Sequence, residues 1–517
     1  MNDSSVVTIE QDDLVSRVRA DAPLRVGPEA SQDRLGARGV ALLLAMTTAA
    51  IGVHGYHPYV EDAEIYLPGI KKILDPALYP RNTGFFASHA GMTLFPNLIA
   101  ASVRITHIPF DWALLAWQFG CVFVLLLACW KIGRLVFRDP LARWGGVALV
   151  GSLLTIPVAG TALYIMDQYL NTRSLSAATV LMMVASVGEQ RYARAGLWAL
   201  FTVAIHPLMF VFGFTFALVV LGLRVLPMEV LEPEMALAAL IPVGLFPPMS
   251  NVYHEALQSR PYFFLSRWAW YEWVGLIAPF AAFWLIGRWA KKQEMFEMEQ
   301  MCKALNIFGL IFAVASLLTI PAGFERFTLL QPMRYLHLTY VLMFVFAGGL
   351  LAQKVLRRRV LRWIVLFVPL CAGMFFVQRD LFAATPQLEL PGVASPNAWV
   401  LAFVWIRQNA PKDAYFALNP EHSRIVGEDQ HGFRAIAERS MLADNNKDSG
   451  AVTMFPGMAE TWKEQTTAQE GWGHFQRADF KRLKSRFGVD WVVVEQSSVA
   501  DLDCPYSNEQ VKVCRIE

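Results

Sequence analysis

The stretch YVEDAEIYLPGI, residues 59–70, decides how this sequence is interpreted. It places three carboxylates, Glu61, Asp62 and Glu64, within four positions, shortly after the apolar run Gly39–Val53. Similar uncharged runs recur along the chain, and each approaches the roughly 20 residues that a helix needs to span a bilayer. Since backbone groups in lipid must hydrogen-bond within the protein, the sequence predicts a bundle of membrane-spanning helices.

The composition supports this interpretation and excludes one broad class of function. The chain has 517 residues, of which 55% are hydrophobic and 17% charged, with a mean hydropathy of +0.37. Its net charge of +2 excludes a strongly basic nucleic-acid-binding protein. Residues 1–38 are polar and mixed in charge, and the first apolar run lacks a small-residue cleavage site. We therefore expect a disordered cytoplasmic tail over residues 1–38, followed by an uncleaved anchor helix.

The charges of the loops predict which ends of the spans share a side of the membrane. Four loops rich in lysine and arginine are expected in the cytoplasm: residues 131–143, 188–194, 287–292 and 354–362. With a cytoplasmic N-terminus, Gly91–Ile105 must then be an interfacial or half-inserted helix. Ala195–Leu223 must be two spans bent at His206-Pro207, because proline disfavours helical backbone in the residue before it. The sequence thus predicts an α-helical polytopic protein of about eleven spans, near residues 39–54, 111–130, 144–164, 174–188, 195–206, 207–223, 236–250, 271–289, 304–322, 334–352 and 361–378.

The last part of the chain has a different composition. We expect a transmembrane domain over residues 39–384, with a first outer loop over residues 54–110, and a small extracytoplasmic α/β domain over residues 385–517. Within that domain a helix is expected from Ser395-Pro396, strands at residues 414–420 and 490–496, and a helix at residues 479–488 that ends at Gly488. Cys504 and Cys514 lie ten residues apart in this domain and are expected to form a disulfide.

Two groups of acids fall on the predicted outer side. The residues after Asp62 suit a helix along the membrane surface, and Glu64 is expected to be a solvated bystander on it. The same charges are also explained by an ordinary solvated helix face. Asp167, beside Gln168 and Arg173, closes the third predicted span. If Asp62 and Asp167 converge, they can bind Mg²⁺ or Mn²⁺ through oxygen ligands or deprotonate a hydroxyl, whereas the simpler alternative is helix capping or pairing with Arg173.

Other polar residues lie at or inside the apolar runs. Arg334 opens the tenth predicted span, where an arginine suits a lipid phosphate that it grips with two hydrogen bonds. The alternative is an arginine whose head simply reaches the interface. His206 and His337 lie within apolar runs. Polar groups there are often functional, but hydrogen-bonded bundle histidines are equally common.

With this layout the chain resembles the GT-C superfamily of membrane glycosyltransferases, which take sugars from polyprenyl-phosphate donors. It is similar to the aminoarabinose and protein O-mannosyl transferases of that superfamily. The resemblance is carried by the acid pair and following tyrosine of YVEDAEIYLPGIKKILDPALYPRNTGFF (residues 59–86), by YIMDQYL (164–170) and by AIHPLMFVFGF (204–214). The family implies membrane-surface helices in the first outer loop and a catalytic acid at its start.

The resemblance also implies roles for individual residues. Asp62 would be the general base, with Glu61 as the competing choice, because the family's acid pair is often Asp-Glu and here is Glu-Asp. Asp167 would support a metal ion or the acceptor, and Arg334 would bind the lipid phosphate. The remaining residues expected to line the substrate site are Arg173, Tyr66, His206 and Gln168.

These implications predict a multi-pass enzyme of the bacterial inner membrane with its C-terminal domain in the periplasm. Its partners would be membrane lipids, a polyprenyl-phosphate-linked sugar, and a glycan, lipid or protein acceptor. Two rival functions stay open: a lipid or polysaccharide transporter or flippase, and a catalytically inactive scaffold of the same fold. A transporter would carry ionisable groups near the middle of the membrane.

Overall fold

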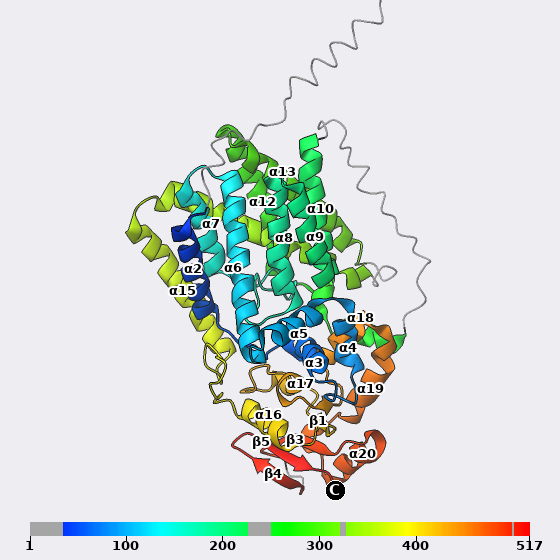
Figure 1. Cartoon of the computed structure of the whole chain (residues 1–517). Helices are drawn as coiled ribbons and strands as arrows, with labels where there is room; N and C mark the ends of the chain where they lie inside the picture. The colour runs from blue at the N-terminus through cyan, green and yellow to red at the C-terminus, as the bar shows by residue number, and fades with distance from the viewer. Residues whose placement is uncertain (1–34, 226–249, 321–326, 499–500) are drawn as a thin grey trace, which may run out of the picture. The chain divides into compact units, whose positions relative to one another are not determined.

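The computed structural model describes residues 35–225, 250–320, 327–498 and 501–517. The chain divides into two compact units, residues 1–45 and 46–517. The described residues of the first unit begin helix α2, which runs over Ala37–His54. All the other described elements belong to the second unit, which is drawn with its labels in Figure 1.

A bundle of long apolar helices makes up most of the second unit. Among the described residues, seven helical segments are long and apolar enough to cross a membrane, which confirms a multi-pass helical protein but not the count of eleven. The helices α8 and α9 are apolar but shorter, and the predicted span 236–250 lies outside the described residues except for Ser250. The bundle helices are α6 (Phe110–Val136), α7 (Pro140–Ser152), α8 (Thr172–Gly188), α9 (Tyr192–Ile205), α10 (Pro207–Val225), α12 (Trp270–Lys292), α13 (Phe296–Leu317), α14 (Leu336–Leu351) and α15 (Val360–Leu381).

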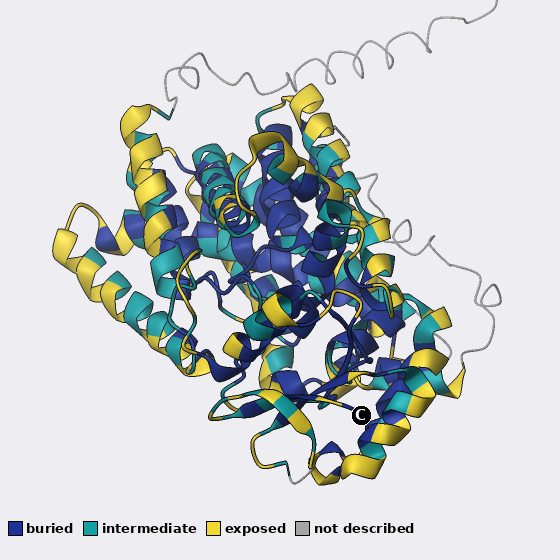
Figure 2. Ribbon diagram, turned by 60° about the horizontal axis from the view of Figure 1, so that its bottom comes forward, coloured by how far each residue is buried: buried dark blue, intermediate teal, exposed yellow. Residues whose placement is uncertain are grey.

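Small residues let the central helices approach one another closely. Helix α8 is buried along almost its whole length by α6, α9 and α10, and it presents serines, threonines and alanines to them. Helices α7 and α14 cross at Gly145 and Gly348, where a methyl group on either glycine would overlap the backbone of the other. Without a hydrophobic driving force inside lipid, such close packing is what holds membrane helices together. Figure 2 shows the buried residues in the interior of the bundle and the exposed ones on its outer helices.

The predicted third span is wrong in its second half. We expected a helix over residues 144–164, but α7 ends at Ser152 and residues 153–171 are irregular. Pro157 lies in this segment and restricts the residue before it, and the chain turns back so that Val158 donates a hydrogen bond to the carbonyl of Leu163. The turn delivers Asp167 to the start of α8. The predicted break at His206 is present, because α9 ends at Ile205 and α10 begins at Pro207.

The four basic loops are linked to one another at one end of the bundle. Lys131 and Arg134 both contact Glu189, and Arg224 contacts both the carbonyl of Val187 and Glu297. Farther along, Lys354 lies over the ring of Trp289, 5.1 Å from its centroid. These contacts connect the ends of the helices α6, α8, α10, α12 and α14, as the loop charges predicted.

The first loop folds into three helices, α3 (Ala63–Leu74), α4 (Gly84–Met92) and α5 (Phe95–Thr106). Helix α5 takes the place of the expected interfacial helix and, at 12 residues, is too short to cross a bilayer. Helix α3 forms where a helix was expected, but its polar face is not solvated: most of its residues are buried, against α4, α5 and the last part of the chain. Glu64 is only 1% exposed and is therefore not a solvated bystander.

The last part of the chain, residues 385–517, surrounds a five-stranded mixed sheet and is called the tail below. The strand order is β2-β1-β3-β5-β4, with β2, β1 and β3 parallel and β5 and β4 antiparallel. Apolar side chains of α16 and α17 cover one face and those around α20 the other. The elements are α16 (Ala398–Asn409), β1 (Tyr415–Leu418), α17 (Phe433–Ala437), β2 (Ser440–Met441), α18 (Lys447–Met454), α19 (Ala459–Ala468), α20 (Arg477–Phe487), β3 (Trp491–Glu495), β4 (Asp503–Ser507) and β5 (Val511–Arg515).

Local sequence signals correctly predicted several elements of the tail. Asn397, two residues after the expected start, caps α16 by accepting hydrogen bonds from the backbone of Trp399 and Val400. Helix α20 ends at Gly488, whose φ of 73° is the left-handed conformation that glycine adopts readily. Cys504 and Cys514 form the expected disulfide, which joins β4 to β5.

Buried ion pairs fasten the tail to the first loop. The carboxylate of Glu64 accepts hydrogen bonds from the backbone of Arg434 and Ala435, so α3 caps the start of α17. The guanidinium of Arg434 donates to both oxygens of Asp448, at 3.0 and 2.7 Å. One arginine therefore joins the elements α3, α17 and α18. Helix α11 (Asn251–Gln258) adds a second contact by packing on α18 and α19.

We predict that Arg434→Leu strongly destabilises the protein. It leaves two buried carboxylates without their cation, and removing one partner of such a pair costs about 3–5 kcal/mol. Thermal unfolding of the detergent-solubilised protein should show a large fall in Tm. The control is Arg482→Leu, because the Arg482 side chain is 57% exposed on α20 and should matter little. Equal small effects of the two substitutions would contradict the structural role of Arg434.

Candidate functional site

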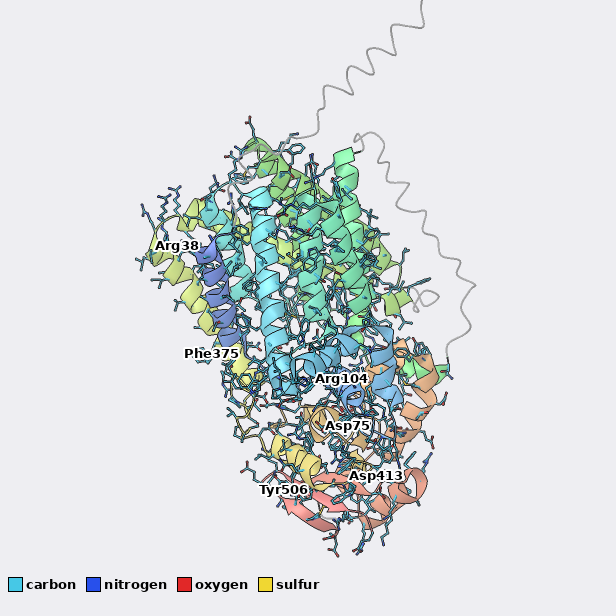
Figure 3. The ribbon with its side chains drawn as sticks, in the orientation of Figure 1. Arg38, Asp75, Arg104, Phe375, Asp413 and Tyr506 are labelled. Atoms are coloured by element: carbon cyan, nitrogen blue, oxygen red, sulfur yellow. A yellow bond between two sulfur atoms is a disulfide. The ribbon has the colours of Figure 1, made fainter. Side chains whose placement is uncertain are left out.

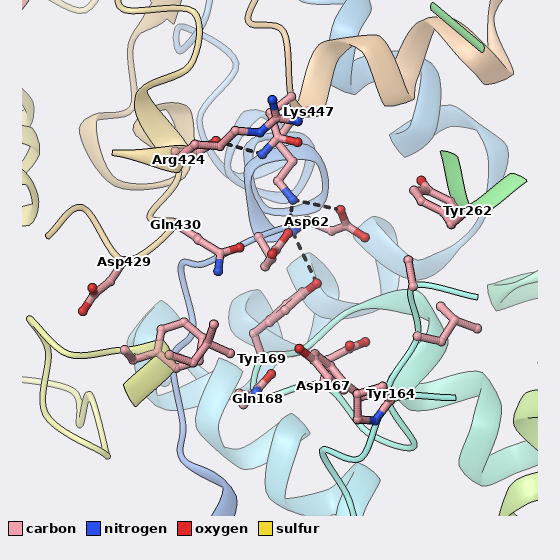
Figure 4. Close-up of a pocket in the computed structure, with 18 of the residues that line it drawn as sticks. Asp62, Tyr164, Asp167, Gln168, Tyr169, Tyr262, Arg424, Asp429, Gln430 and Lys447 are labelled. Carbon is pink, nitrogen blue, oxygen red and sulfur yellow. Dashed lines mark hydrogen bonds and ion pairs between the residues drawn. The ribbon is translucent and has the colours of Figure 1, made fainter. Parts of the chain in front are cut away.

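A polar cavity of about 740 Å³ lies where the helical bundle meets the tail. Its wall is built from the residues before α3, the irregular segment before α8, the end of α15, residues 423–430 of the tail, and the start of α18. Figure 4 shows Lys447 and Asp62 on one side of this cavity and Asp167 with Gln168 on another. Residues from the whole length of the second unit therefore meet here.

The two acids expected at the site lie close together. Arg173 donates from Nη1 to Asp62 Oδ2 at 3.0 Å and from Nη2 to Asp167 Oδ2 at 3.2 Å. Since one guanidinium reaches both, the carboxylates lie within the roughly 10 Å expected of a shared site. Asn171 fixes this geometry, because it caps α8 through Ser174 and donates to Asp167 Oδ2 at 2.6 Å. The first turn of α8 thereby aims Arg173 at the cavity.

A lysine of the tail completes the cluster. Lys447, in the first turn of α18, forms an ion pair with Glu61 and lies 3.5 Å from Asp62 Oδ1. Glu61 has a φ of 54°, which is unusual for a residue other than glycine. Its backbone donates a hydrogen bond to the carbonyl of Gln430 in the tail. The acid pair Glu61-Asp62 is thus held from both the bundle and the tail.

These contacts fix the protonation state of Asp62. Burial by itself raises the pKa of the Asp62 carboxyl, but Lys447 and then Arg173 outweigh it and hold that pKa well below its usual range. Burial lowers the pKa of Lys447, but Glu61 and Asp62 outweigh it and raise that pKa. Asp62 is therefore an ionised carboxylate at neutral pH, able to accept a proton, although a weak base.

A second cavity, of about 380 Å³, shares a wall with the first. Outside that wall it is lined mostly by apolar side chains from α3, α4, α10 and the segment before η8 (Pro332–Tyr335), and none of the described residues that line it there is a lysine, an arginine or a carboxylate. We call the two cavities the polar and the apolar cavity. The residues of the shared wall are Asp62, Arg173, Arg260, Tyr262, Arg334 and Lys447.

Two arginines of the shared wall are not neutralised within the described residues. Arg334 makes no side-chain hydrogen bond or ion pair with the described part of the chain, and its Nε is buried without a partner. Arg260 donates to Ser449 Oγ at 3.0 Å but has no carboxylate partner among the same residues. Arginine grips phosphate oxygens with two parallel hydrogen bonds. The wall therefore offers positive charge to an anionic ligand.

The other residues expected at the site fall into both cavities. Tyr66 and His206 line the apolar cavity, and Gln168 lines the polar one, where its amide bonds to Gln378. His337 lines neither of the two and instead bonds to the carbonyl of Ile165 at 2.9 Å. No sequence pattern singled out Lys447 or Arg260 as a residue of the site, because only the fold brings the tail and the loop before α12 to the first loop.

The donor set does not fit the divalent cation expected from the sequence. Among the described residues, no group of three or more histidines, cysteines or carboxylates is placed to hold a metal ion. Arg173 already lies between Asp62 and Asp167, and Lys447 lies beside Asp62. Hard cations need several free oxygen ligands. Arg173 and Lys447 thus place positive charge beside the two acids that the sequence predicted as metal ligands.

A buried cluster of two histidines and a glutamate stands behind the site. Glu389 accepts from His57 Nδ1 at 2.7 Å and lies 3.1 Å from His431 Nε2. His431 also forms an isolated β-bridge with Val60, next to Glu61. Through this bridge the cluster of His57, Glu389 and His431 supports the backbone that carries Glu61 and Asp62.

Electrostatics make this brace depend on pH. Burial raises the pKa of Glu389, but His431 and then His57 outweigh it and lower that pKa to about 2. Burial lowers the pKa of His431, but Glu389 outweighs it and raises that pKa. A raised histidine pKa contributes stability below the unfolded value of 6.5, and a lowered glutamate pKa contributes it above 4.5. The Glu389–His431 pair therefore stabilises the folded protein most between pH 4.5 and pH 6.5. Its contribution to the free energy of unfolding falls as the pH rises through the folded pKa of His431.

We predict that His431→Gln destabilises the protein by about 3 kcal/mol at pH 6, and by less at pH 9. Thermal unfolding of the purified protein at the two pH values measures the difference. His474→Gln is the matched control, since His474 is exposed in the tail. A loss that is the same at both pH values would show that His431 acts only by packing.

No family model matches this chain, and no curated protein matches it. The residues of the two cavities therefore carry the functional argument.

Proposed function

We propose that this protein is a membrane glycosyltransferase that moves a sugar from a polyprenyl-phosphate donor to an acceptor hydroxyl, as its resemblance to the GT-C superfamily implies. One observation carries the proposal: a carboxylate and two arginines without carboxylate partners share the wall between a polar and an apolar cavity. A polyprenyl-phosphate sugar consists of an apolar chain, a phosphate and a sugar in that order, which matches the order of the apolar cavity, the cationic wall and the polar cavity. Binding sites generally combine an apolar surface with a few placed polar groups.

In this proposal the isoprenoid chain enters the apolar cavity beside Tyr66 and Leu330. Burial of its methylene groups stabilises the complex by about 0.8 kcal/mol each. The phosphate lies against Arg334 and Arg260 on the shared wall. The sugar then reaches past the wall toward Asp62 and into the polar cavity.

The reaction is a single displacement at the anomeric carbon. The acceptor oxygen forms a bond to that carbon, the proton of the hydroxyl passes to the Asp62 carboxylate, and the bond from the carbon to the phosphate oxygen breaks. The electron pair leaves with the polyprenyl phosphate, whose charge Arg334 and Arg260 stabilise. Attack opposite the leaving group inverts the configuration. Glycosyl transfer passes through an oxocarbenium-like transition state. The acceptor hydroxyl becomes strongly acidic only once its oxygen has begun to bond to the anomeric carbon, so a weak base is sufficient to take its proton.

The rival functions differ in what they require of the same residues. A transporter or flippase would need ionisable groups along a path near the middle of the bundle. Here the carboxylates gather in the polar cavity next to the tail, while the basic loops meet one another at the ends of α6, α8 and α12. An inactive scaffold has no need of an ionised Asp62 between two cavities.

The basic loops also support the proposed placement in a bacterial inner membrane. By the positive-inside rule the ends of α6, α8, α10, α12 and α14 would face the cytoplasm. The polar cavity and the tail would then lie on the periplasmic side. Donor sugars linked to polyprenyl phosphate are presented to GT-C enzymes on that side, as the resemblance implies.

We predict that Asp62→Asn lowers transfer by about 10²–10⁴-fold, which is the usual contribution of a positioned general base. Glu61→Gln should cost less than tenfold, because Lys447 and Arg173 still position Asp62. Purified variants in proteoliposomes, supplied with a panel of radiolabelled polyprenyl-phosphate sugars, measure the rate. A fully active Asp62→Asn variant would contradict the mechanism, and a larger loss in Glu61→Gln would move the role of base to Glu61.

We also predict that transfer does not depend on a divalent cation. Treatment with EDTA should change the rate by less than about twofold, because arginine and lysine side chains occupy the charged positions. The same transfer assay, repeated after dialysis and after addition of Mg²⁺ or Mn²⁺, checks this. A loss that either metal restores would show that Asp62 and Asp167 bind a cation during the reaction.

A further inference from the structure

The charged side chains around the two cavities are separated by sign. The shared wall carries four cations, Arg173, Arg260, Arg334 and Lys447, and one carboxylate, Asp62. The rest of the polar cavity has the opposite balance. Its charged residues there are four carboxylates, Glu61, Asp167, Asp380 and Asp429, and one cation, Arg424.

The ion pairs sharpen this separation. Glu61 is paired with Lys447, and Asp167 with Arg173. These pairs neutralise the middle of the combined cavity. The one cation among the described residues that line the polar cavity outside the shared wall, Arg424, is itself paired with Glu421 at 2.7 Å. What remains is positive charge at one end and negative charge at the other.

Two carboxylates of the polar cavity, Asp380 and Asp429, have no cationic partner among the described residues. Asp429 receives hydrogen bonds through Oδ2 alone, from the backbone of Ala384 and the hydroxyl of Thr385. Asp380, at the end of α15, is exposed and has no ion pair with any described residue. Figure 4 shows Asp429 and Tyr262, a residue of the shared wall, at opposite sides of the cavity. The negative end therefore lies away from the proposed phosphate site.

The uncharged polar residues that line the polar cavity can hydrogen-bond to the hydroxyl groups of a ligand. The side chains of Ser423, Gln430 and Asn446 line the polar cavity outside the shared wall, and each can donate and accept hydrogen bonds; Asn446 donates to Ser423 Oγ at 2.9 Å. A ligand rich in hydroxyls can satisfy such a surface, whereas an anion meets two carboxylates and no unpaired cation among the described residues.

We infer that the acceptor is a glycan without acidic groups, either neutral or amino-substituted, which binds at the end of the polar cavity that carries Asp380 and Asp429. This assignment of the acceptor rests on the proposed function. Like charges close together repel, and such repulsion is a common way to exclude wrong ligands. The same separation of charge sets the orientation of the donor. Its phosphate binds at the cationic shared wall, because Asp380 and Asp429 repel it from the acidic end.

The test measures binding of three sugars that differ in charge at nearly constant shape: glucosamine, glucose and glucuronate. Saturation-transfer NMR on the full-length protein in nanodiscs at low salt gives their relative affinities. Glucosamine and glucose should bind, and glucuronate should bind at least about fivefold more weakly, since one repelled unit charge at this range is worth about 1 kcal/mol. Equal or tighter binding of glucuronate, or no binding of any of the three, overturns the inference.

Charge reversal at Asp380 makes the test specific to this site. Asp380→Lys should move the ratio of glucosamine to glucuronate affinity by about tenfold toward glucuronate, and Asp380→Asn by about half as much on a logarithmic scale. Asp413→Lys is the matched control, because Asp413 is exposed in the tail and does not line the polar cavity (Figure 3). A ratio that Asp380→Lys leaves unchanged, or that Asp413→Lys shifts equally, overturns the inference.

A separate probe keeps this result distinct from the proposed function. Farnesyl phosphate carries the lipid and phosphate of the donor but no sugar, and its binding should weaken by about tenfold or more in Arg334→Gln. If farnesyl phosphate does not bind, the proposed donor site fails whatever the sugars do. If it binds but the sugars show no charge preference, only the acceptor assignment fails.

Discussion

The bidentate contact of Arg434 with Asp448, together with Glu64 at the start of α17, is the interaction on which the site depends. Glu64 lies two residues after Asp62, and Asp448 directly follows Lys447. The same buried network that fastens the tail to the first loop therefore also sets the separation of Asp62 and Lys447. Because three ionisable groups are buried together and hydrogen-bonded to one another, loss of one is costly, and the geometry of the site is correspondingly well defined.

From this constraint follows a division of the combined cavity into three zones. Outside the shared wall, the described lining of the apolar cavity contains no lysine, arginine or carboxylate. The shared wall is cationic, and the far end of the polar cavity is acidic. Each zone is assembled from distant parts of the chain, so the tail is a component of the site rather than an appended module. In the proposed reaction the zones take the lipid, the phosphate and the acceptor, with Asp62 where the last two meet.

Local patterns predicted those features that depend on local physics. Apolar runs predicted the helical bundle, His206-Pro207 predicted the break between α9 and α10, and loop charges predicted that Asp62 and Asp167 lie on the same side. Glu64 was misjudged, because a charge run resembles a solvated face unless its partner Arg434, 370 residues away, is known. The third span was misjudged because hydropathy does not register the turn around Pro157. No sequence pattern singled out Lys447, Arg260 or Arg434 for these roles, since only long-range packing creates them.

The central claim is that a lipid phosphate enters through the apolar cavity and meets Asp62 at the shared wall. Photo-crosslinking with a diazirine-bearing isoprenoid phosphate, followed by peptide mass spectrometry, tests it most directly. We expect labels at residues that line the apolar cavity, and loss of these labels when farnesyl phosphate competes; these residues are Pro207, Leu208, Val211, Leu329 and Leu330. Labels confined to lipid-exposed helices such as α12 and α15, insensitive to the competitor, would contradict it.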